Sequence, residues 1–169
     1  DNDSNTSVDH INDLLSTFKH SDITYYRNNT NIGLYPNWNR CIDLTTTTYL
    51  TILGDDDLLP PDFVEATLNV LINDLSVGSV FVSTKLIDKD SDELRTNNFR
   101  YLLQKIRLSV LRRLKIKNIR FSPYSLFYRY PLSGVLGLVF KKSLVEPPYQ
   151  FNTSYYPISD YCFFLSLVC

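Results

Sequence analysis

The stretch Tyr49-Leu50-Thr51-Ile52-Leu53-Gly54-Asp55-Asp56-Asp57-Leu58-Leu59-Pro60-Pro61 decides the predicted fold. Its first five residues are typical of a buried strand, and that strand runs directly into three consecutive aspartates. Adjacent carboxylates repel one another unless a cation or water screens them. Ligands of open α/β sheets bind outside the carboxyl ends of the strands, where oxygen ligands suit Mg²⁺ or Mn²⁺. The stretch therefore predicts a cation-binding turn, with a solvated turn of helix-capping aspartates as the simpler alternative.

Apolar residues at helical spacing alternate with short apolar runs on both sides of this stretch. The predicted helices span residues 8–18, 35–44, 62–74 and 99–117, and a last helix begins at Ser159, its expected N-cap. The predicted strands span residues 23–27, 49–53, 77–84 and 134–140. Strands that alternate with helices indicate an α/β fold with a mostly parallel sheet flanked by helices.

The composition of the 169 residues, 44% hydrophobic and 21% charged, is that of one ordinary globular domain. Three cysteines without a Cys-x-x-Cys pair argue against a disulfide framework or a zinc site and favour a reducing compartment. The sequence contains no Met and ends inside an apolar segment. We therefore expect a fragment of a longer protein, cut at both ends, that lacks part of the site and is inactive by itself.

The charge is unevenly distributed along the chain. Residues 1–99 carry 16 acidic and 6 basic side chains, residues 100–169 carry 2 and 11, and eight bases without an acid fall between Arg100 and Arg120. This basic amphipathic segment is open to three interpretations: a solvated helix face, nucleic-acid binding, or docking on an anionic membrane surface. We favour peripheral membrane contact through residues 100–120 and no nucleic-acid partner. The aromatic stretch 121–130 that follows suits either packing or a sugar-binding platform.

Two further acidic positions are candidates. The loop Asp1–Asn5 begins like a calcium-binding loop, but Thr6 and Asn12 stand where that loop needs Gly and Glu. It suits a strand-end loop whose first Asp meets a ligand, or a polar turn before the next helix. Asp160 lies at a helix start, where a single Asp is commonly a cap. Paired with the aspartate triplet, it would supply a base opposite a metal site.

In order, these motifs resemble those of the family 2 glycosyltransferases, inverting enzymes of the GT-A (Rossmann-like) fold. The resemblance rests on five segments: Asp1–Asn5, Asn31–Asn39, Tyr49–Pro61, Ser133–Lys142 and Asp160–Leu165. Two positions depart from the family pattern. Gly54 stands where many members have Asp, and Ser159 stands where many have Glu or Asp. The family's first strand is missing.

The resemblance implies a role for each aspartate. Asp1 accepts a hydrogen bond from the uracil-type base of the donor, and Asp55 contacts the ribose or a metal-bound water. Asp56 and Asp57 hold Mn²⁺ or Mg²⁺ on the diphosphate, and Asp160 takes the proton from the acceptor hydroxyl. Residues 1–84 are then the nucleotide-sugar half of a single catalytic domain, and residues 85–169 are the acceptor half.

The resemblance also implies a setting. The donor is a nucleotide-sugar, expected to be a UDP-sugar with a hexosyl group, and the acceptor is a glycan or lipid-linked. The enzyme works in surface polysaccharide synthesis, in the cytoplasm at the inner face of the membrane. Two alternatives stay open: a Mg²⁺-dependent nucleotidyltransferase, and a non-catalytic carbohydrate-binding domain of the same fold.

Overall fold

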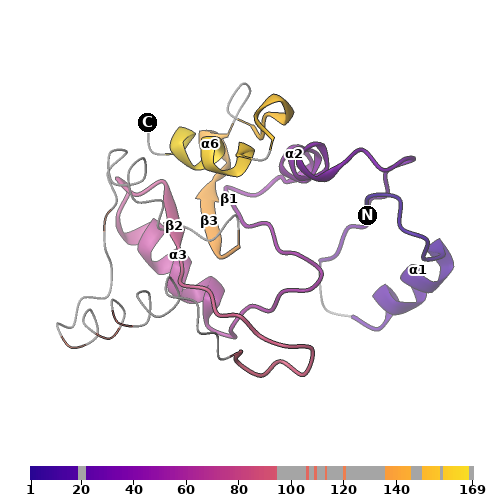
Figure 1. Cartoon of the computed structure of the whole chain (residues 1–169), viewed down its shortest axis with the longest axis horizontal. Coiled ribbons are helices and arrows are strands. Elements are labelled where there is room, and N and C mark those ends of the chain that lie inside the picture. The colour runs from indigo at the N-terminus through magenta and orange to yellow at the C-terminus, as the bar shows by residue number, and fades with distance from the viewer. Residues whose placement is uncertain are drawn as a thin grey trace.

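The computed structural model describes residues 1–18, 22–94, 136–145, 150–156 and 158–167, together with Ile106, Ser109, Arg113 and Arg120. Its helices and strands follow the chain in the order shown in Figure 1. The elements are α1 (Val8–Ser16), α2 (Leu34–Leu44), β1 (Tyr49–Leu50), α3 (Phe63–Asn73), β2 (Ser79–Phe81), β3 (Leu138–Lys141), the 3₁₀ turns η1 (Lys142–Leu144) and η2 (Thr153–Tyr155), and α6 (Ser159–Ser166).

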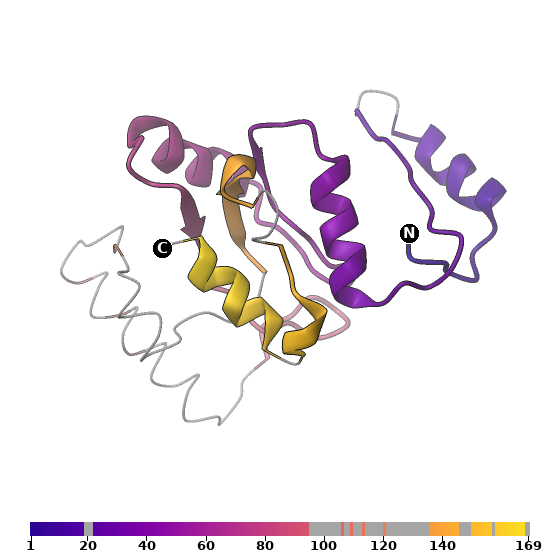
Figure 2. The same ribbon diagram turned by 90° about the horizontal axis from the view of Figure 1, so that it is seen from above.

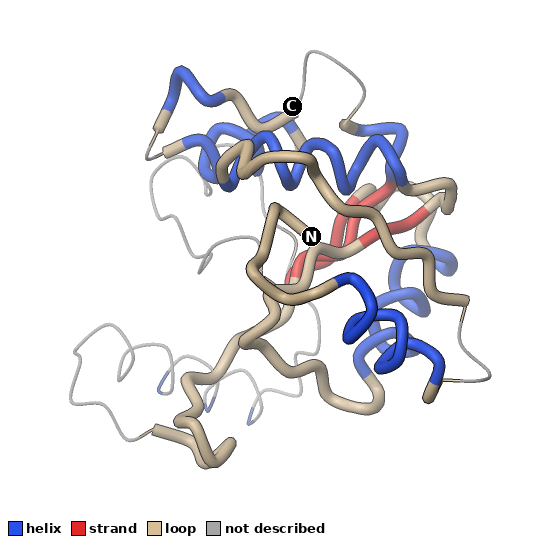
Figure 3. The backbone as a smooth tube through the Cα atoms, turned by 90° about the vertical axis from the view of Figure 1, so that its right-hand side faces the viewer, coloured by secondary structure: helices blue, strands red, loops and turns tan. Residues whose placement is uncertain are grey.

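The body of the molecule has three layers, with the sheet between α2 and α6 on one face and α3 on the other (Figures 1 and 3). The central strand β3 shows why. Leu138 and Phe140 point into a core shared with α2 and α6, while Val139 between them packs with Phe63 and Leu71 of α3. Successive side chains of a strand alternate between faces, so one apolar strand serves two cores.

The pairing of the strands differs from the sequence-based expectation. The strand order is β1-β3-β2, and both pairs in the described residues are antiparallel. β1 and β2 therefore run in the same direction, as a strand–helix–strand unit through α3 predicts, but they do not pair with each other. β3 lies between them. Helical spacing and apolar runs indicate which segments are strands; they do not indicate which strand enters from a distant part of the chain.

The helices agree with the sequence more closely than the strands do. Helices α1, α2 and α3 match their predicted spans to within two residues at each end. Residues 23–27, predicted as a strand, form no regular strand. They nevertheless lie beside the first residue: the amino group of Asp1 donates to Tyr26 O at 2.8 Å, and Asn28 N donates to Asp1 O at 2.9 Å. Two such bonds around one residue are the pattern of a parallel bridge.

Helix α1 lies apart from the three layers (Figure 2). Ser7 caps it, since its side chain accepts from His10 N, but no α1 residue is buried. Its predicted apolar stripe includes Val8 and Leu14, which are 43% and 54% exposed. Helix α1 is thus an amphipathic helix whose apolar stripe takes no part in either core.

Candidate active site

The aspartate triplet forms a tight turn just after β1. Asp57 N donates to Gly54 O at 3.4 Å, which places Asp55 and Asp56 at the two central positions of the turn. Asp55 and Asp56 are exposed and Asp57 is half-buried. Within the described residues, none of the three side chains forms a hydrogen bond or an ion pair. The turn therefore presents carboxylates that no protein group neutralises.

The carboxylates of Asp56 and Asp57 converge over the α-carbon of Gly54. A methyl group placed on that carbon would lie 2.6 Å from Asp57 Oδ2 and 2.9 Å from Asp56 Oδ1, both below van der Waals contact. Glycine at position 54 thus leaves the space in which the two carboxylates meet. Two unpaired carboxylate oxygens close together are hard ligands of the kind that Mg²⁺ and Mn²⁺ prefer.

These residues fit a divalent ion, although they make up only part of a coordination shell. In the parts of the chain that the structure describes, no group of three or more His, Cys, Asp or Glu side chains is arranged to hold a metal. Mg²⁺ commonly takes one or two protein carboxylates and completes its shell with water and phosphate oxygens. Asp56 and Asp57 match that requirement, and Asp55 remains outside the pair.

Asp1 is held tightly in a separate neighbourhood. Its carboxylate accepts from Ser4 N at 2.8 Å, from Ser4 Oγ at 3.0 Å and from Tyr25 Oη at 2.7 Å. Arg27 Nε lies 3.7 Å from the same carboxylate, and the Asp1 side chain is only 11% exposed. These contacts organise the loop Asp1–Asn5 and give Asp1 a structural role beside the proposed one.

Asparagine side chains connect this loop to the start of α2. Asn2 Oδ1 accepts from Ile32 N and from Asn28 Nδ2, and Asn2 Nδ2 donates to Asn31 Oδ1 at 3.0 Å. The buried Asn28 also donates to Asn37 Oδ1 at 2.9 Å. The backbone donor of Ile32 fixes which Asn2 atom is oxygen, because only an oxygen can accept from it. The Asn-rich segments that the sequence singled out are thus brought together as one network.

Gly33 makes the approach of α2 possible. It precedes α2 with φ +86°, a left-handed conformation that side chains disfavour. Its N–H donates to Asn31 Oδ1 and its carbonyl accepts from Asn37 N. Pro36 follows within the first turn of α2, where its missing N–H costs nothing.

Asp160 lies in the first turn of α6, but the predicted N-cap is wrong. The residue before the helix is Ile158, which provides no side-chain cap, and Ser159 is the first helical residue. Ser159 is fully buried, and its hydroxyl has no hydrogen-bond partner within the described residues. Asp160 is half-buried, and its Oδ1 accepts from Tyr161 N at 2.8 Å.

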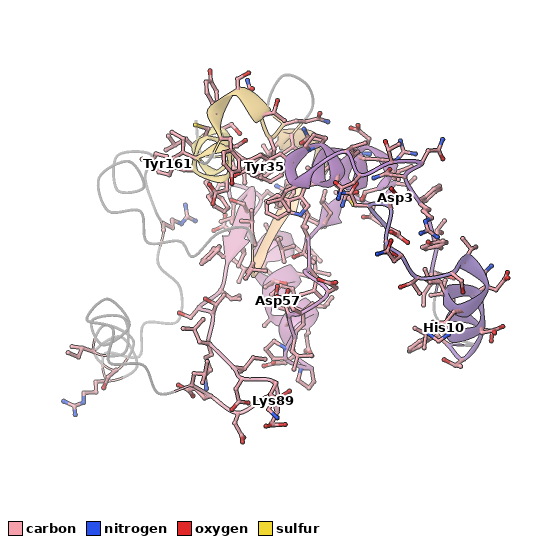
Figure 4. All side chains as sticks on the ribbon, turned by 45° about the vertical axis from the view of Figure 1, so that its right-hand side comes forward. Asp3, His10, Tyr35, Asp57, Lys89 and Tyr161 are labelled. Atoms are coloured by element: carbon pink, nitrogen blue, oxygen red, sulfur yellow. The ribbon has the colours of Figure 1, made fainter. Side chains whose placement is uncertain are left out.

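Sequence reasoning missed Tyr35, which lies beside Asp160. Tyr35 is 7% exposed and sits where α2 meets α6, as Figure 4 shows. Burial raises the pKa of its phenol, and the neighbouring Asp160 carboxylate raises that pKa further. The backbone N–H groups of Asp160 and Ser159 face the phenolic oxygen and partly oppose this rise in pKa. The helical spacing of Tyr35 predicts only that it faces a core.

An aromatic cluster holds the junction of α2 and α6. Phe151 stacks on Phe163 of α6 with ring centroids 4.0 Å apart, and on Tyr35 of α2 at 5.8 Å. Asn39 of α2 exchanges two hydrogen bonds with the backbone of Phe151, at 2.8 and 2.9 Å. The loop before α6 is therefore fixed to α2 by both packing and polar contacts.

Three predicted features remain outside these neighbourhoods. The helix expected at residues 99–117 and the aromatic stretch 121–130 lie outside the described residues, apart from Ile106, Ser109 and Arg113 within that helix. Arg120, the last of the predicted membrane-facing bases, pairs with Asp74. No helix in the described part of the chain has the length and hydropathy of a membrane span.

The comparisons with known proteins agree with the motif order. The family model described as glycosyl transferase family 2 matches residues 1–136. The match includes the Asp1 loop, the asparagine network and the aspartate turn, and it ends before β3 and α6. A search of curated proteins finds no match.

Proposed function

Since this chain belongs to glycosyl transferase family 2, we propose that it transfers a hexosyl group from a UDP-sugar to a glycan or lipid-linked acceptor. Membership of the family assigns glycosyl transfer as the class of reaction. The observation that supports a nucleotide-sugar donor is the turn at Gly54. Its Asp56 and Asp57 carboxylates converge with no protein partner in the described residues, ready for a cation that would otherwise have to be excluded.

The proposed reaction is one displacement with inversion. The acceptor hydroxyl oxygen attacks the anomeric carbon while the bond from that carbon to the diphosphate oxygen breaks, and the diphosphate leaves with the electron pair. Asp160 takes the proton of the hydroxyl, because a weak nucleophile needs a carboxylate within hydrogen-bond reach. Bound Mn²⁺ or Mg²⁺ on Asp56 and Asp57 would neutralise charge on the diphosphate.

The remaining aspartates bind the donor in this proposal. Asp1 faces the base, and its contacts with Ser4 and Tyr25 keep its carboxylate in one orientation. Asp55, exposed at the centre of the turn, contacts the ribose or a metal-bound water. The asparagine network then connects base recognition to the start of α2.

Isothermal titration of the full chain with MnCl₂ and UDP tests the metal site. We expect Asp56→Asn and Asp57→Asn each to weaken Mn²⁺ binding by about tenfold or more, since each removes a charged oxygen ligand. Asp62→Asn is the matched control, because Asp62 is an exposed aspartate a few residues away that makes no side-chain cap. Equal Mn²⁺ affinity in all three variants and the wild type would contradict the proposal.

We also propose that residues 100–120 contact an anionic membrane surface at the cytoplasmic side, where a surface polysaccharide is assembled. The support is the run of eight bases without an acid. Sedimentation with phosphatidylserine vesicles tests it, using charge reversal to Glu at Lys105, Arg107, Arg112 and Arg113. Unchanged sedimentation would reject the membrane contact and leave the transfer reaction unaffected.

A further inference from the structure

Helix α6 begins without a cap from its own segment. The first backbone N–H groups of a helix have no partner within it, and a Ser, Thr, Asp or Asn before the helix commonly accepts from them. Ile158 stands at that place and cannot. Ser159 comes one residue too late, with its hydroxyl buried and unpartnered within the described residues. Another part of the chain has to provide the acceptor.

Tyr35 provides it from the opposite helix. The phenolic oxygen faces the backbone N–H groups of Asp160 and Ser159, which are the first two residues of α6. Figure 4 shows Tyr35 where α2 and α6 meet. Burial keeps the phenol neutral by raising its pKa, with Asp160 as the next contribution. The Asp160 carboxylate therefore lies close to the hydroxyl that caps its own helix.

The Tyr35 ring has little freedom to move. It stacks on Phe151 with an angle of 6° between the ring planes, and the edges of Trp38 and Tyr156 approach at 5.7 and 6.1 Å. Phe151 is itself anchored to α2 by the two hydrogen bonds to Asn39. A hydroxyl on a ring held from three sides defines a fixed point for the start of α6.

We propose that Tyr35 is a positioning residue, whose hydroxyl caps α6 from α2 and thereby fixes the carboxylate of Asp160. The inference rests on the proposed function of Asp160 as the base that takes the acceptor proton. Its importance for catalysis comes from the sensitivity of proton transfer to position, where a displacement of about 1 Å costs up to about 100-fold in rate.

The first test needs no substrate. The full chain is labelled with ¹³Cζ-tyrosine, and the Tyr35 signal is assigned by its loss in Tyr35→Phe. Asp160→Asn should move this signal at neutral pH and shift its alkaline titration to lower pH, because the negative charge that raises the pKa of Tyr35 is gone. Asp56→Asn, which removes a carboxylate from the turn after β1, serves as the control and should leave the signal in place. An unmoved Tyr35 signal in Asp160→Asn overturns the inference.

The second test measures turnover as release of UDP from UDP-glucose with MnCl₂. Tyr35→Phe keeps the ring packing and removes the hydroxyl, so we expect kcat to fall about 10- to 100-fold with Mn²⁺–UDP affinity unchanged. Tyr49→Phe is the matched control, because Tyr49 packs on the α3 side of the sheet. An unchanged kcat in Tyr35→Phe overturns the positioning role.

The two tests separate this inference from the proposed function. A wild-type chain that binds no Mn²⁺–UDP and releases no UDP counts against the donor proposed above. The ¹³C experiment still decides whether Tyr35 and Asp160 are coupled. If Tyr35→Phe fails to fold, the Asp160→Asn titration in the otherwise native protein gives the same decision.

Discussion

Asp1 and Asp160, two aspartates proposed for the active site, are held in place by different means. Asp1 sits in a cage of hydrogen bonds from Ser4, Tyr25 and the Arg27 ion pair, on an exposed loop. Asp160 sits on a short helix whose other side is packed into aromatic rings, and Tyr161 N donates to its Oδ1. The first arrangement depends on the identity of donors and acceptors, and the second depends on volume.

This difference indicates which substitutions each region tolerates. An aromatic junction loses free energy when atoms are removed, because the surrounding rings cannot close the cavity completely. A polar cage loses free energy when a donor becomes an acceptor, even at constant volume, because a buried polar group is left unsatisfied. The aspartate turn has neither kind of support, which makes it sensitive to local crowding.

The largest effect is expected from Phe163→Ala. Phe163 is 1% exposed, stacks on Phe151 at 4.0 Å and meets Phe140 at 5.4 Å. Removing its ring should lower the free energy of unfolding by about 3–5 kcal/mol. Urea denaturation followed by circular dichroism measures the change.

Phe18→Ala is the control for that change, because Phe18 is 53% exposed after the end of α1. We expect its effect to stay within about 1 kcal/mol. If both variants lose the same free energy, packing does not distinguish the α2–α6 junction from the rest of the chain, and the comparison fails.

The junction also shows what the sequence could and could not predict. Periodicity placed α2, α3 and α6 correctly, because apolar spacing reports which face of a helix is buried. It could not place β3 between β1 and β2, since strand order depends on contacts between distant segments. Tyr35 was missed for the same reason: its partner Asp160 lies on the last helix, and no local pattern connects them.

The next effect is expected from Asn28→Asp, which keeps the volume of a buried side chain and removes its donors. Asn28 Nδ2 donates to Asn2 Oδ1 and Asn37 Oδ1, so a carboxylate would face two amide oxygens. We expect a loss of about 1–3 kcal/mol in the free energy of unfolding. Hydrogen exchange should also quicken at Ile32 N, which donates to Asn2 Oδ1.

Asn69→Asp provides the matched comparison, since Asn69 is exposed on α3. Its effect should remain within about 0.5 kcal/mol. Unchanged exchange at Ile32 N in Asn28→Asp would show that the network does not hold the loop, and that Asp1 is positioned by Ser4 and Tyr25 alone.

Gly54→Ala tests the region that has neither support. The new methyl group would lie 2.6 Å from Asp57 Oδ2, so the converging carboxylates must turn away. We expect Mn²⁺ affinity to fall about tenfold, a change of about 1.4 kcal/mol in binding free energy, with the stability of the fold preserved. Isothermal titration and urea denaturation measure the two quantities on the same samples.

Gly78→Ala reverses that pattern and serves as its control. Its methyl group would lie 2.6 Å from Leu144 Cδ1, next to the core. Overpacking should lower the free energy of unfolding by about 1–3 kcal/mol and leave Mn²⁺ affinity unchanged. If Gly54→Ala binds Mn²⁺ as tightly as the wild type, the convergence of Asp56 and Asp57 does not form the metal site.

The smallest effect is expected from Asp74→Asn, a hydrogen-bonded aspartate on the surface. Ser76 Oγ donates to Asp74 Oδ1 at 2.6 Å and contributes most to lowering the pKa of Asp74, while Arg120 contributes less. A carboxyl whose pKa is lower in the folded chain stabilises the fold above the unfolded value and loses that contribution as the pH falls through the folded value. Asp74→Asn should therefore flatten the loss of stability below about pH 4, measured as the urea midpoint against pH.

The order of two further variants shows whether local hydrogen bonds or charge dominate at this exposed site. Ser76→Ala should reproduce more of the Asp74→Asn effect than Arg120→Gln, because the ion pair is screened by solvent while the hydrogen bond is local. The reverse order would mean that charge dominates even at the surface. The Arg27 ion pair of Asp1 would then carry more of that cage than the hydrogen bonds from Ser4 and Tyr25, and the distinction drawn between the two aspartates would have to be restated in terms of charge.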